Sequence, residues 1–145
     1  MTMYPGGCHC GNIELMFTTD TAPEQLVMRE CQCSFCRKHG VRTITDRAGS
    51  VAISVRDSEK LSSYTFGQSV AEFLVCRECG IYVAAYMTHE RGAVATLNIN
   101  ALHANPFGVR RGDSADYSSE DAQSRALRRI AMWTPAELKL VQGVR

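Results

Sequence analysis

Seven cysteines, gathered into three short clusters, are the residues of this chain whose types and spacing could do chemistry. The clusters are Cys8-His9-Cys10, Cys31-Gln32-Cys33-Ser34-Phe35-Cys36 and Cys76-Arg77-Glu78-Cys79. Zinc prefers thiolate ligands in a tetrahedron, and a C-x-C or C-x-x-C turn brings two thiolates to one ion at little entropic cost. Two closed four-thiolate sites would need eight cysteines. Seven therefore predict one closed structural site and one three-thiolate site with a vacant ligand position, where a bound metal could take part in a reaction.

The spacing of the clusters indicates which cysteines share an ion. Cys31, Cys33 and Cys36 lie within six residues, so one ion can bind all three while the chain closes almost no loop. The remaining four form two pairs about seventy residues apart, which are Cys8 with Cys10 and Cys76 with Cys79. Closing that long loop is tolerable because loop-closure entropy grows only logarithmically with length. A structural zinc there would add free energy to folding, since the assembled site does not exist in the unfolded chain.

Other assignments of the same residues stay open. His39 follows Cys36 by three residues and could close the middle site, in which case both metals are structural and the protein is a non-catalytic interaction module. The middle cluster could instead hold free thiols, or the cysteines could form disulfides. An odd cysteine count without a secretory signal favours metal thiolates in a reducing cytoplasm.

Composition and charge restrict the class of protein. At 145 residues the chain is long enough for one domain that buries roughly two-thirds of its unfolded surface. The net charge of +1 creates no overall field that would attract nucleic acid or an anionic membrane. Residues 1–7 lack the features of a secretory signal, and no stretch approaches the ~20 apolar residues of a membrane span. We therefore expect one cytoplasmic domain over residues 1–145.

The first hundred residues predict a mainly β protein. Alternating or β-branched and aromatic runs, typical of strands, occupy residues 13–17, 25–30, 51–55, 62–66, 70–75, 81–87 and 93–98. Two connections look like hairpin turns, at Gly67-Gln68 and at Glu90-Arg91-Gly92. Residues 34–39 predict a helical turn, and residues 98–116 predict a polar loop.

Residues 118–141 predict a helical extension. Ser118 or Ser119 could cap a first helix that has Glu120 and Asp121 in its first turn. Its expected apolar side is Ala122, Ala126, Leu127, Ile130 and Trp133. The expected solvated face, balanced by nearby acidic residues, carries Arg125, Arg128 and Arg129. The segment Thr134-Pro135-Ala136-Glu137 has the pattern of a capping box and predicts a second, short helix.

Three motifs occur in a specific order: G-C-H-C-G at residues 7–11, C-Q-C-S-F-C-R-K at 31–38 and C-R-E-C-G at 76–80. In this order, over about residues 5–103, they resemble the glutathione-dependent formaldehyde-activating enzyme family, which includes centromere protein V. The resemblance implies a zinc-bearing β-tent fold of folded-over antiparallel sheets. It also implies a structural zinc and a catalytic zinc on the two cysteine sets, which are Cys8, Cys10, Cys76 and Cys79, and Cys31, Cys33 and Cys36.

The same resemblance implies a zinc-dependent carbon–sulfur lyase that handles thiol–aldehyde adducts such as S-hydroxymethylglutathione. Three thiolates leave a divalent zinc with a net charge of about −1, so it is a poorer Lewis acid than zinc on three histidines. It could still polarise an aldehyde or hydroxymethyl oxygen, or bind a thiolate. Glutathione carries two carboxylates, so Arg37 and Lys38 are the candidate substrate contacts, with Arg42 next.

A methionine sulfoxide reductase shares the tent-like architecture and a four-cysteine zinc. Its chemistry needs a free nucleophilic cysteine, which in this chain only the middle cluster could supply.

From the resemblance to the formaldehyde-activating family, we expect a small-molecule thiol or its aldehyde adduct as the partner, with two zinc ions per chain. The three-thiolate site is expected to bind its ion less tightly.

Overall fold

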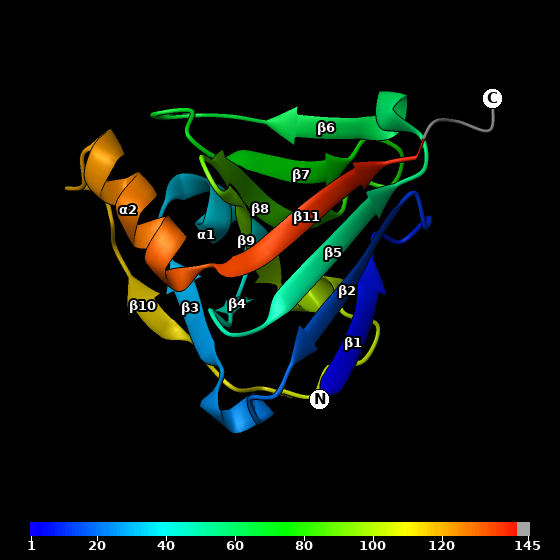
Figure 1. Cartoon of the computed structure of the whole chain (residues 1–145), viewed down its shortest axis with the longest axis horizontal. Coiled ribbons are helices and arrows are strands. Elements are labelled where there is room, and N and C mark those ends of the chain that lie inside the picture. Colours follow the sequence, from blue (N-terminus) through cyan, green and yellow to red (C-terminus); the bar gives the residue numbers. More distant parts are fainter. Residues whose placement is uncertain (142–145) are drawn as a thin grey trace.

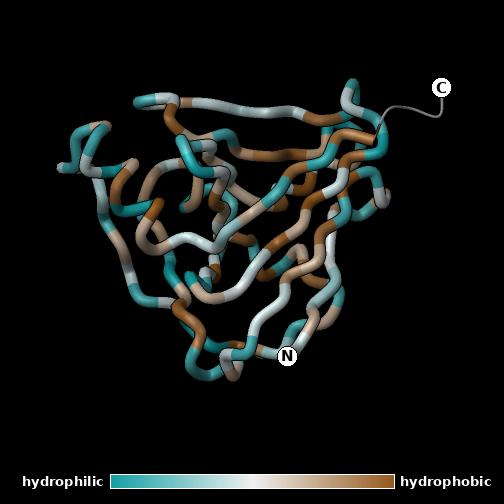
Figure 2. Tube along the Cα trace, viewed as in Figure 1, coloured by the Kyte–Doolittle hydropathy of each residue, from teal (hydrophilic) through white to brown (hydrophobic). Residues whose placement is uncertain are grey.

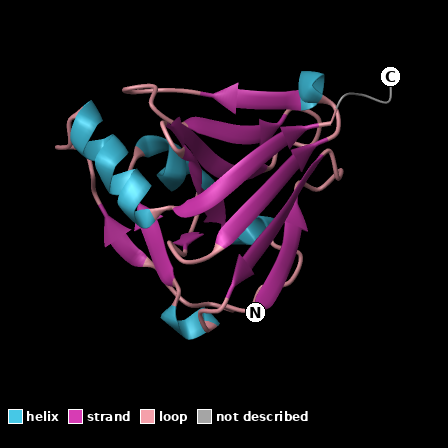
Figure 3. Cartoon of the chain, viewed as in Figure 1, coloured by secondary structure: helices cyan, strands magenta, loops and turns pink. Residues whose placement is uncertain are grey.

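Backbone pairing joins all the strands of the computed structural model, which describes residues 1–141, into one open sheet. The strands are β1 (Thr2–Gly7), β2 (Ile13–Thr19), β3 (Val27–Cys31), β4 (Thr43–Thr45), β5 (Ser50–Val55), β6 (Leu61–Tyr64), β7 (Glu72–Cys76), β8 (Tyr82–His89), β9 (Gly92–Asn98), β10 (Asp113–Ala115) and β11 (Thr134–Leu140). The helices are α1 (Ser34–His39) and α2 (Ala122–Met132), with short 3-10 turns η1 (Pro23–Gln25), η2 (Ser58–Lys60) and η3 (Ile99–Ala101). Figure 3 shows how much of the backbone is strand. The prediction of a mainly β protein with a short C-terminal helix is confirmed.

The sheet folds over on itself. Its strands follow the order β1-β2-β5-β11-β9-β4-β3-β10, and β9 also pairs with β8, which continues to β7 and β6. Most neighbours are antiparallel, whereas β10 with β3 and β11 with β5 are parallel. In Figure 1, β6 and β7 cross the top of the view above the diagonal strands β11, β5, β2 and β1. Helix α2 lies at the left margin beside β10 and α1.

Most local predictions from the sequence are confirmed. Strands β2, β5 and β9 cover the expected segments, and α1 has the expected bounds, residues 34–39. Both expected hairpins form antiparallel pairs, β6 with β7 and β8 with β9. Strands β1 and β4 were not predicted, and the segment expected as a loop contains η3 and β10.

The predicted second C-terminal helix is wrong, because residues 134–140 form strand β11. The Thr134 hydroxyl, which would cap such a helix, accepts a hydrogen bond from the Asp46 N–H at 2.9 Å instead. Strand β11 pairs with β9 at its start and with β5 along the rest of its length, so it links two parts of the sheet. Its alternation, with Ala136 and Leu138 packed on the core and Glu137 and Lys139 exposed, is the period-2 signal of a strand.

Two clusters of buried side chains support the sheet. The larger one lies between β2, β5 and β9, where Ile13, Phe17 and Ile53 are at most 1% exposed and each contributes about 1.5–3 kcal/mol by leaving water. The smaller one surrounds Cys36 and includes Tyr82 and Trp133. In Figure 2 the hydrophobic stretches follow the strands and the hydrophilic ones the outer loops. The smaller cluster is the base of the site described next.

Among residues 1–141, no helix has both the length and the apolar character that a membrane crossing requires.

Candidate functional site

The fold brings Cys8, Cys10, Cys76 and Cys79 together as one set, which we call the quartet. Their four sulfur atoms all lie within 4.8 Å of one another. The Sγ atoms of Cys8 and Cys10 are 3.7 Å apart, and those of Cys10 and Cys76 are 3.5 Å apart. Sulfurs about 2.3 Å from a metal in a tetrahedron lie about 3.8 Å apart, whereas disulfide sulfurs lie about 2.05 Å apart. The spacing fits one shared metal ion, and all seven cysteines are free of disulfides.

Two similar turns hold the quartet. The Cys8 N–H donates to the Ile13 carbonyl at 2.9 Å, and the Cys76 N–H donates to the Ile81 carbonyl at 3.0 Å. The Ile13 N–H in turn donates to the Cys8 Sγ at 3.2 Å. A glycine in a positive-φ conformation, which other residues rarely adopt, ends each turn: Gly11 at +85° and Gly80 at +81°. The same backbone arrangement thus positions Cys8 and Cys76.

The second set, Cys31, Cys33 and Cys36, lies where β3 ends and α1 begins, and we call it the trio. Its sulfur atoms also lie within 4.8 Å of one another. Cys33 is the N-cap of α1, and its Sγ accepts a hydrogen bond from the Cys36 N–H at 3.4 Å. Hydrogen bonds from Cys31 and Cys36 lower the pKa of Cys33 to about 2, while the same contacts and burial raise the pKa of Cys36. One thiol thus ionises at the expense of its neighbours, a competition that a bound cation would relieve.

His39 does not join the trio. Its ring packs on Phe35, with ring centroids 4.5 Å apart, and on Tyr82 at 5.5 Å. Within the described part of the chain, no histidine, aspartate or glutamate belongs to the trio's group of potential ligands. The closed site that included His39 is therefore not the arrangement in this structure, and the trio offers three protein ligands.

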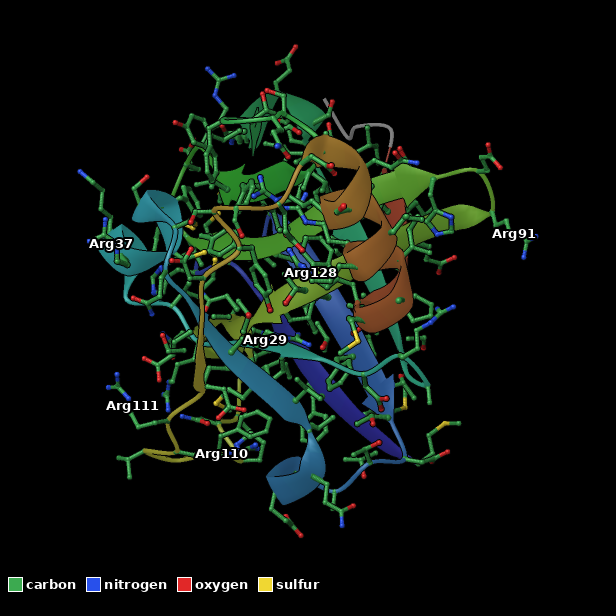
Figure 4. All side chains as sticks on the ribbon, turned by 90° about the vertical axis from the view of Figure 1, so that its left-hand side faces the viewer. Arg29, Arg37, Arg91, Arg110, Arg111 and Arg128 are labelled. Carbon is green, nitrogen blue, oxygen red and sulfur yellow. The ribbon has the colours of Figure 1, made fainter. Side chains whose placement is uncertain are left out.

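A cavity of about 180 Å³ adjoins the trio, and all three of its cysteines line it. The aromatic part of the wall consists of Phe66, Phe73, Tyr82, Tyr117 and Trp133. The cationic part consists of four arginines, Arg29 from β3 and Arg125, Arg128 and Arg129 from α2. Figure 4 shows Arg29 and Arg128 close to the ribbons of β3, β10 and α2, whereas Arg37 and Arg111 project away from the molecule.

The arginines of α2 correct the prediction of a solvated face. The side chains of Arg125 and Arg128 are only 18% and 19% exposed, whereas Leu127, expected on the apolar side, is 60% exposed. The predicted cap is also wrong, since Asp121 caps α2 by accepting a hydrogen bond from the Ser124 N–H at 2.7 Å. Glu120 consequently lies before the helix rather than in its first turn.

Glu120 holds in place two arginines on the side of α2 that faces the cavity. Its carboxylate accepts hydrogen bonds from Arg128 Nε at 2.8 Å and Arg128 Nη2 at 3.0 Å, and it pairs with Arg125 Nε at 3.4 Å. The Arg125 Nη2 donates to the Tyr117 carbonyl at 2.7 Å. The Arg128 guanidinium stacks on the Tyr117 ring, 3.4 Å from its centroid. One carboxylate and one aromatic ring therefore hold two of the four cavity arginines in place.

Replacing Glu120 with glutamine is expected to lower the free energy of unfolding by about 1–2 kcal/mol at pH 7, because two charge-assisted contacts are lost. The hydrogen bond from Arg128 holds the pKa of Glu120 below its usual range, against the effect of burial. A depressed carboxyl pKa stabilises the fold above the unfolded-state value of about 4.3, and this contribution disappears as the pH falls through the folded-state value. Urea denaturation should be measured at pH 7 and at pH values below about 4.3. The free energies of unfolding of the wild type and the variant should converge at the acidic pH values.

The matched control for this comparison is Glu137→Gln, which removes an exposed carboxylate on β11. It should change the free energy of unfolding little at any pH. An equal loss in both variants would contradict the structural role assigned to Glu120.

The structure places the predicted substrate contacts outside the cavity. Arg37 and Lys38 are exposed and do not line it, and Arg37 Nε donates to the Gln32 carbonyl at 3.1 Å. Arg42 donates to the carbonyls of Arg110 and Gly108. That Arg37 and Lys38 bind substrate stays a prediction.

The sequence contained signals for the arginines that do line the cavity. Arg29 precedes Cys31 by two residues, so both belong to the same face of β3. Arg125, Arg128 and Arg129 follow the three- and four-residue spacing of one helix face. The spacing identified a common face but not the direction in which it points.

Two comparisons with known proteins place these observations in context. The family model described as glutathione-dependent formaldehyde-activating enzyme matches residues 3–111. The crystal structure of a Rhodobacter sphaeroides protein is similar to this chain, with 30% sequence identity and a TM-score of 0.56. That similarity covers 77% of this chain and 99% of the other. The matched residues 3–111 contain the quartet and the trio, whereas α2 and β11 lie beyond them.

Proposed function

Because the chain belongs to the glutathione-dependent formaldehyde-activating enzyme family, we propose that it is a zinc-dependent carbon–sulfur lyase acting on thiol–aldehyde adducts. S-hydroxymethylglutathione is the representative substrate. The observation that carries this proposal is the trio: three cysteines at the wall of a cavity, with no fourth protein ligand grouped with them among residues 1–141.

The donor chemistry of both sets suits zinc. Four soft sulfur ligands at tetrahedral spacing suit a closed structural ion in the quartet. The trio would hold a second ion, which when bound supplies Lewis-acid polarisation of an oxygen or sulfur ligand. Zinc in both sets, structural in one and catalytic in the other, is part of the proposal.

The residues around the trio suit reversible C–S cleavage. In that reaction the C–S bond breaks, its electron pair stays on sulfur, and the hydroxyl proton of the adduct ends on the thiol as the aldehyde forms. Tyr82 is 2% exposed and lines the cavity beside the trio. Burial, reinforced by the negative charge of the trio, raises the pKa of Tyr82, so the phenol keeps its proton and can donate a hydrogen bond to the reacting oxygen. The aromatic wall limits access of water.

The proposal is tested by measuring the exchange of ¹³C-labelled formaldehyde between its free form and its glutathione adduct by NMR. Zinc-loaded protein is expected to raise the exchange rate above the spontaneous rate, in proportion to protein concentration. An equal concentration of an unrelated zinc protein controls for non-specific effects of added protein and zinc on the exchange rate. A rate equal to the spontaneous one, with glutathione and with smaller thiols, would contradict the enzymatic proposal and favour a non-catalytic zinc-stabilised interaction module.

A further inference from the structure

Helix α2 adds a feature to the cavity that the family-matched residues do not contain. The match ends at residue 111, yet three of the four cavity arginines belong to α2, over residues 122–132. These arginines bring positive charge to the cavity beside the trio. Any ligand that reaches the trio through this cavity therefore meets a wall specific to this chain's C-terminal part.

Arg129 differs from its two neighbours on α2. Glu120 pairs with both Arg125 and Arg128. The Arg129 Nε, in contrast, is buried and has no hydrogen-bond partner among the described residues. Its guanidinium lies over the Trp133 ring, 4.9 Å from the centroid, and both residues line the cavity. The Arg129 Nη groups are not buried in this way and make no ion pair with a carboxylate among the described residues, so they can donate to an acceptor that enters the cavity.

The charges around Arg129 favour an anionic acceptor. Burial, followed by repulsion from Arg128 and Arg125, lowers the pKa of Arg129 to about 10, and the opposing attraction of Glu120 and Cys31 is weaker than this repulsion. The fourth arginine, Arg29, donates to the Thr45 hydroxyl at 3.1 Å and has no carboxylate paired with it among residues 1–141. The cavity's own carboxylate, Asp116, accepts a hydrogen bond from the Ser118 N–H at 2.9 Å.

We infer that Arg129 is a carboxylate-binding subsite in a cavity to which Arg29 adds further positive charge, so that the adduct this chain handles carries a carboxylate close to its sulfur. The inference rests on the proposed function for the position of the sulfur at the trio. A guanidinium offers a carboxylate two parallel N–H donors, a geometry that no neutral substituent matches. The volume of about 180 Å³ is smaller than the roughly 300–1,000 Å³ of sites that enclose larger ligands. It suits a sulfur and one acidic group separated by a short chain.

The single tryptophan of the chain, Trp133, provides a binding signal that does not depend on activity. Zinc-loaded protein is titrated with 3-mercaptopropionate and with 3-mercapto-1-propanol, which differ only in the acidic group, while Trp133 fluorescence is followed. The acid is expected to bind about tenfold or more tightly than the alcohol. Equal affinities would overturn the inference. Because both titrations use the wild-type protein, the result does not depend on whether a variant folds.

Arg129→Gln is expected to abolish the preference for the acid, and Arg129→Lys to retain part of it. The matched control is Arg91→Gln, which removes an exposed guanidinium outside the cavity and should leave the preference intact. A preference that survives in a folded Arg129→Gln protein, as judged by circular dichroism, would overturn the assignment of Arg129.

Glutathione serves as a third probe that separates two sources of the carboxylate. If it depends on Arg129 and binds at least as tightly as 3-mercaptopropionate, the carboxylate is one end of the tripeptide; if it binds more weakly, the ligand is a small thiol acid. Either result supports the subsite. Binding through Arg129 without accelerated formaldehyde exchange would defeat only the proposed function, and exchange without acid preference would defeat only the subsite.

Discussion

Cys76→Ser is expected to abolish the proposed zinc binding by the quartet and to unfold the chain at temperatures at which the wild type is folded. Cys76 ends β7, and through the quartet it is joined to the turn between β1 and β2. A structural zinc contributes an apparent 10–16 kcal/mol at neutral pH, which equals or exceeds the total stability of about 5–15 kcal/mol of most domains. Loss of one of four thiolates therefore removes a large part of the stability.

Two measurements check this expectation: metal content per chain, and thermal melting followed by far-UV circular dichroism. The wild type should carry two zinc ions, and Cys76→Ser should carry at most one and melt well below it or be unfolded throughout. A variant that keeps two ions and the wild-type melting temperature would show that the quartet does not hold a structural metal.

Cys33→Ser is expected to have the opposite pattern, a folded protein with its activity lost. Cys33 caps α1, and serine is itself a preferred N-cap, so the substitution keeps the helix start while it removes a thiolate. The trio lies within one short segment and joins no distant parts of the chain. Even residues that merely support a metal ligand change activity by about 10–100-fold when mutated. Loss of a ligand itself should reduce formaldehyde exchange by at least about 100-fold.

The two serine variants control for each other, because both exchange one sulfur for one oxygen. Formaldehyde exchange at the wild-type rate in Cys33→Ser would show that the trio is not the reactive centre. A melting temperature as low as that of Cys76→Ser would show that the trio is structural, as an interaction module would require.

The cavity combines two features with opposite charge. A zinc ion on three thiolates would carry a net charge of about −1, and the arginines of α2 and β3 oppose it across a small space. A ligand with a sulfur at one end and a carboxylate at the other complements both features, whereas a neutral aldehyde complements only the first. In the proposed function the trio would hold the reacting metal, whereas three of the four arginines that line the cavity come from α2.

Local patterns were sufficient for much of the fold. The alternation in β2, the two hairpins and the six-residue helix α1 depend on neighbouring residues, and each could be predicted. Strand β11 could not, because its pattern satisfies a capping box as well as a strand. Its partners β5 and β9 lie about 40 or more residues away in sequence, and their backbone pairing decided between the two.

The sequence by itself determined the grouping of the seven cysteines into a quartet and a trio, since ligand number and loop length are properties of spacing. Only the tertiary structure decided that His39 stacks on Phe35 instead of closing the trio. It also decided that Arg125, Arg128 and Arg129 face the cavity while Arg37 and Lys38 face away. The physical reason is that periodicity defines which residues share a helix face, whereas the direction of that face depends on how α2 docks, which Glu120 and Tyr117 fix from outside the helix.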